Sequence, residues 1–236
     1  MTASLNSDQQ KCIDAIERGE NVFLTGKAGT GKSFVISEVA RRFDVDITAT
    51  TGVAASIVGG FTINTWAGIG IGDKPASRLI GKHSAQKHIP DTPGWRICNA
   101  TRLVIDEISM LPWHTFQLLH EVMRAVRGQY DKPFGGVQLI LCGDFLQLPP
   151  VNKRSNLNCV LCGSKPSVSP AGHYVCKDKK YDGCLPLVWE STVRFPFEDD
   201  PTGTNLWDYC NFTFVELTQV RSTNRAMYIT AAYELR

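Results

Sequence analysis

The chain has 236 residues and a formal net charge of +2, and hydrophobic residues make up 43% of it. This composition excludes a disordered chain, and the length fits one large domain or one domain with a small insert. No apolar run approaches the roughly 20 residues of a membrane span, and residues 1–10 lack the apolar core of a secretion signal. We therefore expect an intracellular protein without a membrane partner, nuclear or mitochondrial if eukaryotic and otherwise cytoplasmic.

The first part of the chain alternates predicted helices and strands. Ser7-Asp8-Gln9-Gln10 predicts a capping box that opens a helix, and Gly19 is a suitable residue to end it. Residues 21–25 form a short apolar run, which is followed by a glycine-rich turn and a predicted helix over residues 31–43. A second strand is predicted at residues 45–50.

Three further apolar runs, at residues 103–106, 137–142 and 212–217, predict buried strands. Pro112 begins a predicted helix, and a last helix is expected near residues 224–235. The apolar positions of the helix after Pro112 are Phe116, Leu119, Val122, Met123 and Val126. Apolar strands that alternate with helices indicate an α/β fold with a mostly parallel sheet covered on both faces.

Residues 152–201 interrupt this alternation, because they are rich in Pro, Gly, Ser and Cys and show little periodicity. Unstructured loops longer than about 15 residues are uncommon in compact domains. We therefore expect a core formed by residues 1–151, a cysteine-rich insert at residues 152–201, and a final strand and helix of the core in residues 202–236.

The sequence GKAGTGKS at residues 26–33 matches the phosphate-binding loop, and it lies between a predicted strand and a predicted helix. Glycines let the backbone wrap a phosphate with its N–H groups, and the start of the helix adds a favourable dipole. We expect Lys32 to reach the β- and γ-phosphates and the Ser33 hydroxyl to bind Mg²⁺. The other predicted nucleotide contacts are Gly26, Ala28, Gly29, Thr30 and Gly31.

Two later strand ends supply the remaining candidates for nucleotide chemistry. The strand at residues 103–106 ends in two carboxylates, of which Asp106 is placed to hold Mg²⁺ and Glu107 to activate the attacking water. Gln147 follows the strand at residues 137–142 and is a candidate contact for the γ-phosphate. Strand ends of open α/β sheets meet at the ligand crevice, so these groups are expected to lie together.

The segments at residues 50–55 and 61–70 contain small hydroxyl residues and glycines, which suit contacts with a nucleic-acid backbone. The predicted DNA contacts are Thr51, Gly52, Val53, Thr65 and Trp66. Trp66 allows two interpretations, stacking on a base or packing in the core, and taken alone it favours the core.

Five sequence blocks accompany the phosphate loop in a characteristic order. They are ATTGVAA (49–55), TWAGIG (65–70), LVIDEISMLP (103–112), FGGVQLILCGDFLQLPPV (134–151) and VELTQV (215–220). Together they resemble the first motor domain of Pif-type DNA helicases of superfamily one. The resemblance implies a RecA-like P-loop NTPase fold, Mg²⁺-dependent ATP hydrolysis, and 5′-to-3′ movement on single-stranded or forked DNA. It also implies that Gln9 reads the adenine edge through its side-chain amide.

The sequence departs from this family at three places. Asn64 stands where the family often has His, and Arg221-Ser222-Thr223 stands where it usually has Phe-Arg-Gln, so the role of Arg221 is open. The chain ends at Arg236, where the second motor domain of the family would begin. That domain normally supplies an arginine finger, a group worth about 10³–10⁵ in rate in related chemistry. We expect a second motor domain, in cis or in trans, to be needed for unwinding.

The insert contains a candidate zinc site made of Cys159, Cys162, Cys176 and Cys184, with His173 as an alternative ligand. Four such ligands in two halves suit one structural, tetrahedral Zn²⁺, which would also order a segment that has no core. The second half is spaced irregularly, so unliganded or redox-active cysteines stay an alternative. Residues 153–184 carry a net charge of +4, which fits either phosphate contacts or a solvated surface loop.

Three functions fit these observations. The first is an ATP-dependent DNA helicase motor, in which the nucleotide motifs carry the chemistry. The second is a hydrolytically idle module that binds nucleic acid or a protein partner through the insert. The third, a small-molecule P-loop kinase, is disfavoured because a kinase has no use for the Gly-Asp-x-x-Gln block at residues 143–147.

Overall fold

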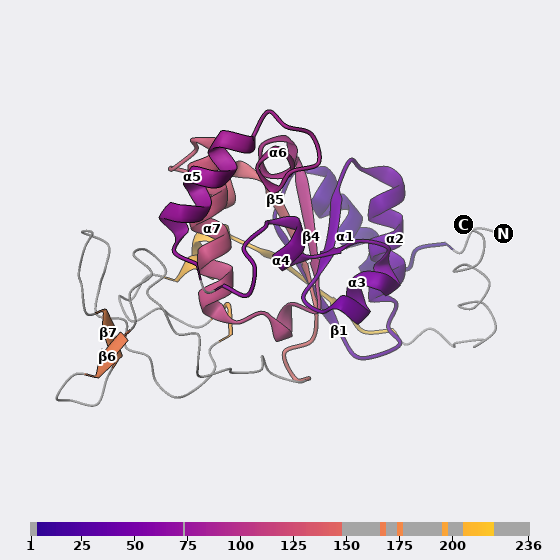
Figure 1. The fold of residues 1–236 in the computed structure, drawn as a ribbon. Helices are drawn as coiled ribbons and strands as arrows, with labels where there is room; N and C mark the ends of the chain where they lie inside the picture. Colours follow the sequence, from indigo (N-terminus) through magenta and orange to yellow (C-terminus); the bar gives the residue numbers. More distant parts are fainter. Residues whose placement is uncertain are drawn as a thin grey trace.

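The computed structural model describes residues 4–72, 74–147, 166–168, 174–176, 195–197 and 205–219. Its main sheet has six strands in the order β3-β2-β4-β5-β1-β8, and every neighbouring pair is parallel (Figure 1). The strands are β1 (Val22–Gly26), β2 (Asp46–Ala49), β3 (Phe61–Thr62), β4 (Arg102–Asp106), β5 (Gln138–Cys142) and β8 (Thr213–Leu217). The α/β fold with a mostly parallel sheet is therefore confirmed.

Helices cover both faces of this sheet, and Figure 1 shows them in two groups on either side of it. The helices are α1 (Ser7–Glu17), α2 (Lys32–Arg42), α3 (Gly52–Val58), α4 (Ile63–Trp66), α5 (Ala76–Gln86), α6 (Pro93–Asn99), α7 (Trp113–Arg127) and α8 (Leu206–Cys210). Two short 3₁₀ turns are η1 (Ile108–Met110) and η2 (Pro133–Gly136). Helices α1 and α2 pack on one face of the sheet, and α4 to α7 pack on the other.

The middle residues of β4 and β5 are apolar, and both faces of these strands are buried. In β4, Leu103 and Ile105 point into the layer of α4 to α7, whereas Val104 points into the layer of α1 and α2. In β5, Leu139 and Leu141 face the first of these layers and Ile140 faces the second. Successive side chains of a strand alternate between its faces, so a continuous apolar run packs into the hydrophobic layers on both sides of the sheet.

Most of the predicted elements are confirmed, with one correction at the first helix. The capping box begins at Asn6, one residue before the predicted position: Gln9 N–H donates to Asn6 Oδ1 (2.9 Å) and Asn6 N–H donates to Gln9 Oε1 (3.1 Å). Asn is as good an N-cap as Ser, so the exchange has a simple physical basis. Gly19 has the positive φ of 81° expected just after a helix, and Pro112 caps α7.

The segment between the two parts of the core is described only in places. It contains an antiparallel pair of short strands, β6 (Pro166–Val168) and β7 (Tyr174–Cys176). After it, α8 leads into β8, which pairs along the whole of β1. The last predicted helix, at residues 224–235, lies outside the described residues. Within the described part of the chain, no helix is long and apolar enough to cross a membrane.

Aromatic side chains connect Phe197 to the sheet and to α8. Phe145, which follows β5, lies 4.6 Å from the Phe197 ring and 5.2 Å from the Phe23 ring of β1. Trp207 of α8 lies against the same group, 5.2 Å from Phe23 and 5.8 Å from Phe145. Phe145, in the loop that follows β5, is thus packed against β1 and against Phe197 and Trp207.

Candidate nucleotide-binding site

The sheet brings the sequence motifs to one edge. Because all six strands are parallel, the carboxyl ends of neighbouring strands lie side by side at that edge. The phosphate loop follows β1, the two carboxylates follow β4, and the segment with Gln147 follows β5, which lies between β1 and β4. The expected convergence of these motifs is therefore present in the fold.

The phosphate loop has the backbone geometry that its glycines allow. Gly26, Gly29 and Gly31 have φ values of 146°, 83° and 96°, in the region that favours glycine. A Cβ atom on Gly26 would lie 2.7 Å from the Leu217 carbonyl oxygen and 2.8 Å from Thr30 Oγ1, so this position has no room for a side chain. Ala28 and Gly29 are exposed and Ser33 begins the exposed side of α2, so the loop faces solvent where a phosphate would enter.

Lys32 holds the loop together in this structure. Its Nζ donates to the Gly26 carbonyl oxygen at 2.6 Å and lies 3.4 Å from that of Lys27. Thr30 adds a hydroxyl bond of 2.8 Å to the same Lys27 carbonyl. The ammonium group thus sits within the loop and is positioned to exchange backbone carbonyls for phosphate oxygens, which are stronger partners for a charged donor.

The carboxylates after β4 are held in an environment that opposes their ionisation. Asp106 is 7% exposed, and burial raises its pKa, while bonds from Glu107 N–H and the Cys142 thiol lower it. Burial and the neighbouring Asp106 both raise the pKa of Glu107, and Lys32 opposes them. A divalent cation would remove this penalty, so the pair is suited to Mg²⁺.

Glu107 has an unusual backbone conformation, with φ 56° and ψ 43°. Four hydrogen bonds hold its two peptide groups. The Asp106 carbonyl accepts from Thr50 N–H at 3.1 Å, and Glu107 N–H donates to Asp106 Oδ1 at 2.9 Å. The Glu107 carbonyl accepts from Thr50 Oγ1 at 2.9 Å and from Met110 N–H at 3.0 Å. On the side of β5, a Cβ on Gly143 would lie 3.0 Å from the Ile108 nitrogen. These hydrogen bonds and the close packing of Gly143 therefore hold Glu107 in its left-handed conformation.

Gln147 lies at the same edge but is tied to its own loop. Its Nε2 donates to Asp144 Oδ2 at 3.2 Å, and its backbone N–H donates to the Asp144 carbonyl at 3.0 Å. Asp144 also raises the pKa of Glu107, so its charge acts on the acidic strand end. The side chain of Gln147 is exposed and can exchange the Asp144 bond for another acceptor.

Gln9 is fully buried, with both of its polar side-chain atoms engaged inside the chain. Its Oε1 accepts from Asn6 N–H at 3.1 Å, and its Nε2 lies 3.5 Å from the Thr30 carbonyl oxygen. In this structure Gln9 therefore links the start of α1 to the phosphate loop. Contact with an adenine would require the amide to exchange these bonds.

Four of the predicted DNA contacts lie near the surface, and one does not. Thr51 caps α3, and Val53 on that helix is 75% exposed. Thr65 is exposed on α4 and its hydroxyl accepts from that of Thr62. Trp66 is 0% exposed and belongs to the core on the α4 to α7 face, which confirms the core interpretation and leaves its side chain unable to stack on a base here. Gly52 is exposed at the first turn of α3.

The candidate zinc ligands fall mostly where the structure gives no description. Cys159, Cys162, Cys184 and the alternative ligand His173 lie outside the described residues, as does Arg221. Cys176 is described, at the end of β7, and is 3% exposed. Among the described residues there is no group of three or more His, Cys, Asp or Glu side chains that could hold a metal ion.

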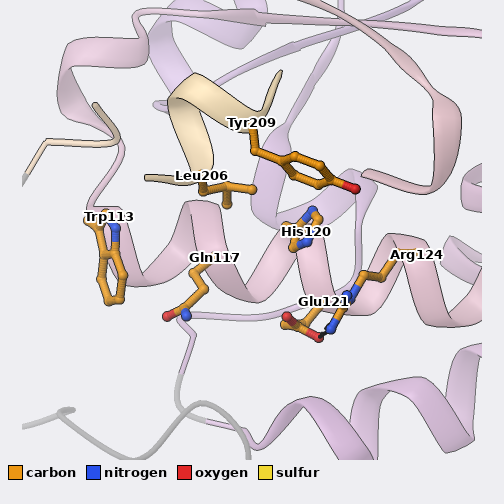
Figure 2. A pocket seen from close by; sticks show the side chains of 7 residues that line it. All are labelled: Trp113, Gln117, His120, Glu121, Arg124, Leu206 and Tyr209. Carbon is orange, nitrogen blue, oxygen red and sulfur yellow. Dashed lines mark hydrogen bonds and ion pairs between the residues drawn. The ribbon is translucent and has the colours of Figure 1, made fainter. Parts of the chain in front are cut away.

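A separate cavity of about 360 Å³ lies between α7 and α8. Figure 2 shows its lining: Trp113, Gln117, His120, Glu121, Arg124, Leu206 and Tyr209. His120 Nδ1 accepts from Phe134 N–H at 3.1 Å, and burial lowers the pKa of His120 to about 4. None of the lining residues belongs to the phosphate loop or to the acidic strand end, so this cavity is distinct from the nucleotide site.

Comparison with known proteins agrees with this arrangement. The family model described as "PIF1-like helicase" matches residues 4–167. The chain belongs to the PIF1-like helicase family. The ATP-dependent DNA helicase PIF1 of Homo sapiens is 37% identical over 220 residues, 91% of this chain and 29% of the human protein. That of Rattus norvegicus is 46% identical over 217 residues, 90% of this chain and 29% of the rat protein.

Solved structures show the same fold. The Pif1 helicase from Candida albicans matches with a TM-score of 0.67 and 28% identity, over 93% of this chain and 41% of that one. The Bacteroides Pif1 helicase in complex with ADP-AlF3 and ssDNA matches with a TM-score of 0.61 and 25% identity, over 97% and 45% of the two chains. The chain spans less than a third of the length of the curated PIF1 relatives that it matches.

Within the PIF1-like fold, two contributors to the site were not singled out in the sequence. Thr50 bonds to the Glu107 carbonyl, and the buried Cys142 thiol bonds to the Asp106 carboxylate. Each of them is the last residue of a predicted strand, and the carboxyl ends of parallel strands lie next to the ligand site. Which groups they bind depends on the register of β2, β4 and β5, and the sequence pattern does not predict that register.

Proposed function

We propose that this chain is the nucleotide-binding motor domain of an ATP-dependent DNA helicase that moves 5′-to-3′ on single-stranded or forked DNA. Membership of the PIF1-like helicase family supports this activity, because the relatives are named ATP-dependent DNA helicases. A second motor domain, in cis or in trans, would complete the cleft around the nucleotide. The polarity of movement is part of the proposal and follows from the family resemblance alone.

The chain's own residues divide the chemistry among them. Lys32 leaves the Gly26 carbonyl and neutralises the β- and γ-phosphates, while the loop N–H groups surround them. Ser33 and Asp106 would hold Mg²⁺, which when bound would neutralise charge at the phosphates. Glu107, with its raised pKa, accepts a proton from the attacking water, and Gln147 contacts the γ-phosphate.

One observation carries the assignment: the parallel order of β4, β5 and β1 brings the phosphate loop and the two carboxylates to the same edge of the sheet, although they come from distant parts of the sequence. There the positive charge of Lys32 opposes the rise that burial causes in the pKa of Asp106 and of Glu107. This is the arrangement that phosphoryl transfer from a Mg²⁺-bound nucleotide requires.

Steady-state ATP hydrolysis, measured with and without single-stranded DNA, tests the proposal. We expect turnover that DNA stimulates and that falls by about 10²–10⁴ in Glu107→Gln, because this change removes the base but leaves the shape of the side chain. A second motor domain is supplied in trans in a parallel measurement. DNA-independent turnover that survives Glu107→Gln under both conditions would contradict the proposal.

For DNA, we propose contacts at the start of α3, from Thr51, Gly52 and Val53, together with Thr65. Exposed backbone amides and hydroxyls at these positions suit phosphate and sugar contacts. The Bacteroides relative was solved with ssDNA, which supports a single-stranded partner.

We also propose that the insert binds one structural Zn²⁺ through Cys159, Cys162, Cys176 and Cys184, with His173 as the alternative to one of them. The position of Cys176 at the end of a short antiparallel strand pair supports this. A bound metal stabilises such a small pair when it has no hydrophobic core of its own. Elemental analysis of freshly purified, reduced protein is expected to give about one equivalent of zinc. A content below about a tenth of an equivalent would contradict the site.

A further inference from the structure

Thr50 connects the proposed DNA-contacting segment to the proposed catalytic carboxylate. It follows β2, whose residues pair with β4 up to Ala49 and Asp106. Thr50 extends this pairing with two bonds, from its N–H to the Asp106 carbonyl (3.1 Å) and from its Oγ1 to the Glu107 carbonyl (2.9 Å). The next residue, Thr51, caps α3 with its hydroxyl. One peptide unit therefore separates the cap of α3 from the support of Glu107.

The backbone conformation of Glu107 depends on the contacts that support it. A non-glycine residue in the left-handed region is strained, and it persists there only while its surroundings hold it. Lower-energy backbone conformations are thus accessible to Glu107 if a support is lost, and they would turn its carboxylate away from the phosphate site.

The supports on the two sides of this peptide differ in character. On the β5 side, Gly143 packs so closely that an added Cβ would lie 3.0 Å from both the nitrogen and the Cγ2 of Ile108. Gly143 directly follows β5, which is a central strand of the sheet. On the β2 side, the Thr50 hydroxyl is the side-chain group that holds the Glu107 carbonyl, next to the Met110 N–H of the 3₁₀ turn, and it lies at the junction of a strand and a short surface helix. The adjustable support is the one beside α3.

We propose that Thr50 is a positioning residue that couples DNA bound at the start of α3 to the conformation of Glu107. DNA held by Thr51, Gly52 and Val53 fixes the strand-to-helix junction, and Thr50 then holds the Glu107 carbonyl in the left-handed turn. This inference deepens the proposed function and rests on it. It assigns to Thr50 the DNA dependence of the site rather than a contact with nucleotide.

Thr50→Val tests the coupling, because valine keeps the shape of threonine and removes only the hydroxyl. Thr48→Val is its matched control: Thr48 lies on the same strand and its Oγ1 also donates to a β4 carbonyl, that of Val104 at 2.6 Å, away from Glu107. Thr50→Ser keeps the hydroxyl and is the rescue variant. Thermal unfolding of all three variants checks that they fold.

The readout is the affinity of the chain for ADP with aluminium fluoride, a mimic of the transferring phosphoryl group, with and without oligo-dT. ADP alone, which lacks the γ-phosphoryl group that Glu107 is proposed to act on, is the reference ligand. In the unaltered protein we expect oligo-dT to tighten binding of the mimic by about fivefold or more relative to ADP. Thr50→Val reduces this effect to less than about twofold, whereas Thr50→Ser and Thr48→Val keep it.

Two results would overturn the inference: full coupling in Thr50→Val, or equal loss of coupling in Thr48→Val. Absence of coupling in the unaltered protein would also overturn it. Failure of the proposed function has a different signature, because there neither ADP nor the mimic would lose affinity in Lys32→Ala.

Discussion

The carboxylate of Glu107 makes opposite contributions to stability and to chemistry. Burial and the neighbouring Asp106 raise its pKa in the folded protein above the unfolded value of about 4.3. The folded state therefore binds this proton more tightly, which stabilises it at low pH. That stabilisation is lost as the pH rises through the window from the unfolded pKa to the raised folded pKa.

Glu107→Gln should accordingly raise the melting temperature of the chain at pH 7, without nucleotide or Mg²⁺. The difference from the unaltered protein should shrink as the pH approaches 4, where Glu107 takes up its proton in both states. Thermal unfolding followed by circular dichroism across this range measures the effect. A lower melting temperature for the variant at pH 7 would show that the site does not disfavour the ionised carboxylate.

At the level of elements, the contact between α5 and α6 depends on a glycine. A Cβ on Gly94 would run into the backbone carbonyl of His83, an atom that cannot move independently of α5. Gly81, also on α5, has nothing within 4 Å of its Cβ position. The two glycines thus lie in the same helix pair but in opposite environments.

Gly94→Ala is expected to destabilise the protein by about 3 kcal/mol, because the two helices must separate to admit the methyl group. Gly81→Ala should stabilise it by about 0.5–1 kcal/mol, since alanine restricts the unfolded chain and favours the helix. Urea unfolding of both variants tests this pair. Equal effects of the two substitutions would mean that α5 and α6 are not packed as described.

The elements differ in how well the sequence predicted them, and for a physical reason. Strands β1, β4 and β5 are buried on both faces, so they appear as continuous apolar runs that can be recognised locally. Helices α3 to α6 and the two-residue strand β3 were not predicted, because they are short and owe their stability to packing rather than to their own periodicity. The burial of Trp66 is a consequence of that packing.

For the site, the sequence predicted which residues meet but not how they are held. The phosphate loop and the strand-end carboxylates carry patterns fixed by their chemistry, and the parallel sheet then brings them together. The left-handed backbone of Glu107 and its bond to Thr50 depend on the register of β2 against β4. The engagement of Gln9 with Asn6 likewise follows from a helix that starts one residue earlier than predicted.

Strand β8 forms one edge of the six-stranded sheet, beside β1, and it comes from the last described part of the chain. Trp207, in the helix before β8, contacts the rings of Phe23 and Phe116 in the core and the ring of Phe197. Removal of the Trp207 side chain should therefore loosen both the β8 edge of the sheet and the contact with Phe197.

Trp207→Ala is expected to cost about 3 kcal/mol in global stability, from lost burial and aromatic contacts. Tyr209→Phe, on the same helix, removes only a bond of 2.7 Å to the Asp131 carbonyl and should cost about 1 kcal/mol or less. Chemical unfolding measures both. If the two variants were equally stable, the aromatic cluster would not join the last strand to the core.

The central claim is that the loop at residues 26–33 binds the phosphates of Mg-ATP through Lys32. Calorimetric titration of Mg-ATP into the unaltered chain and into Lys32→Ala tests it most directly. A hydrogen bond to a charged group is worth about 1.5–3 kcal/mol, so we predict at least about tenfold weaker binding in the variant. Equal affinity of the two proteins for Mg-ATP would contradict the account.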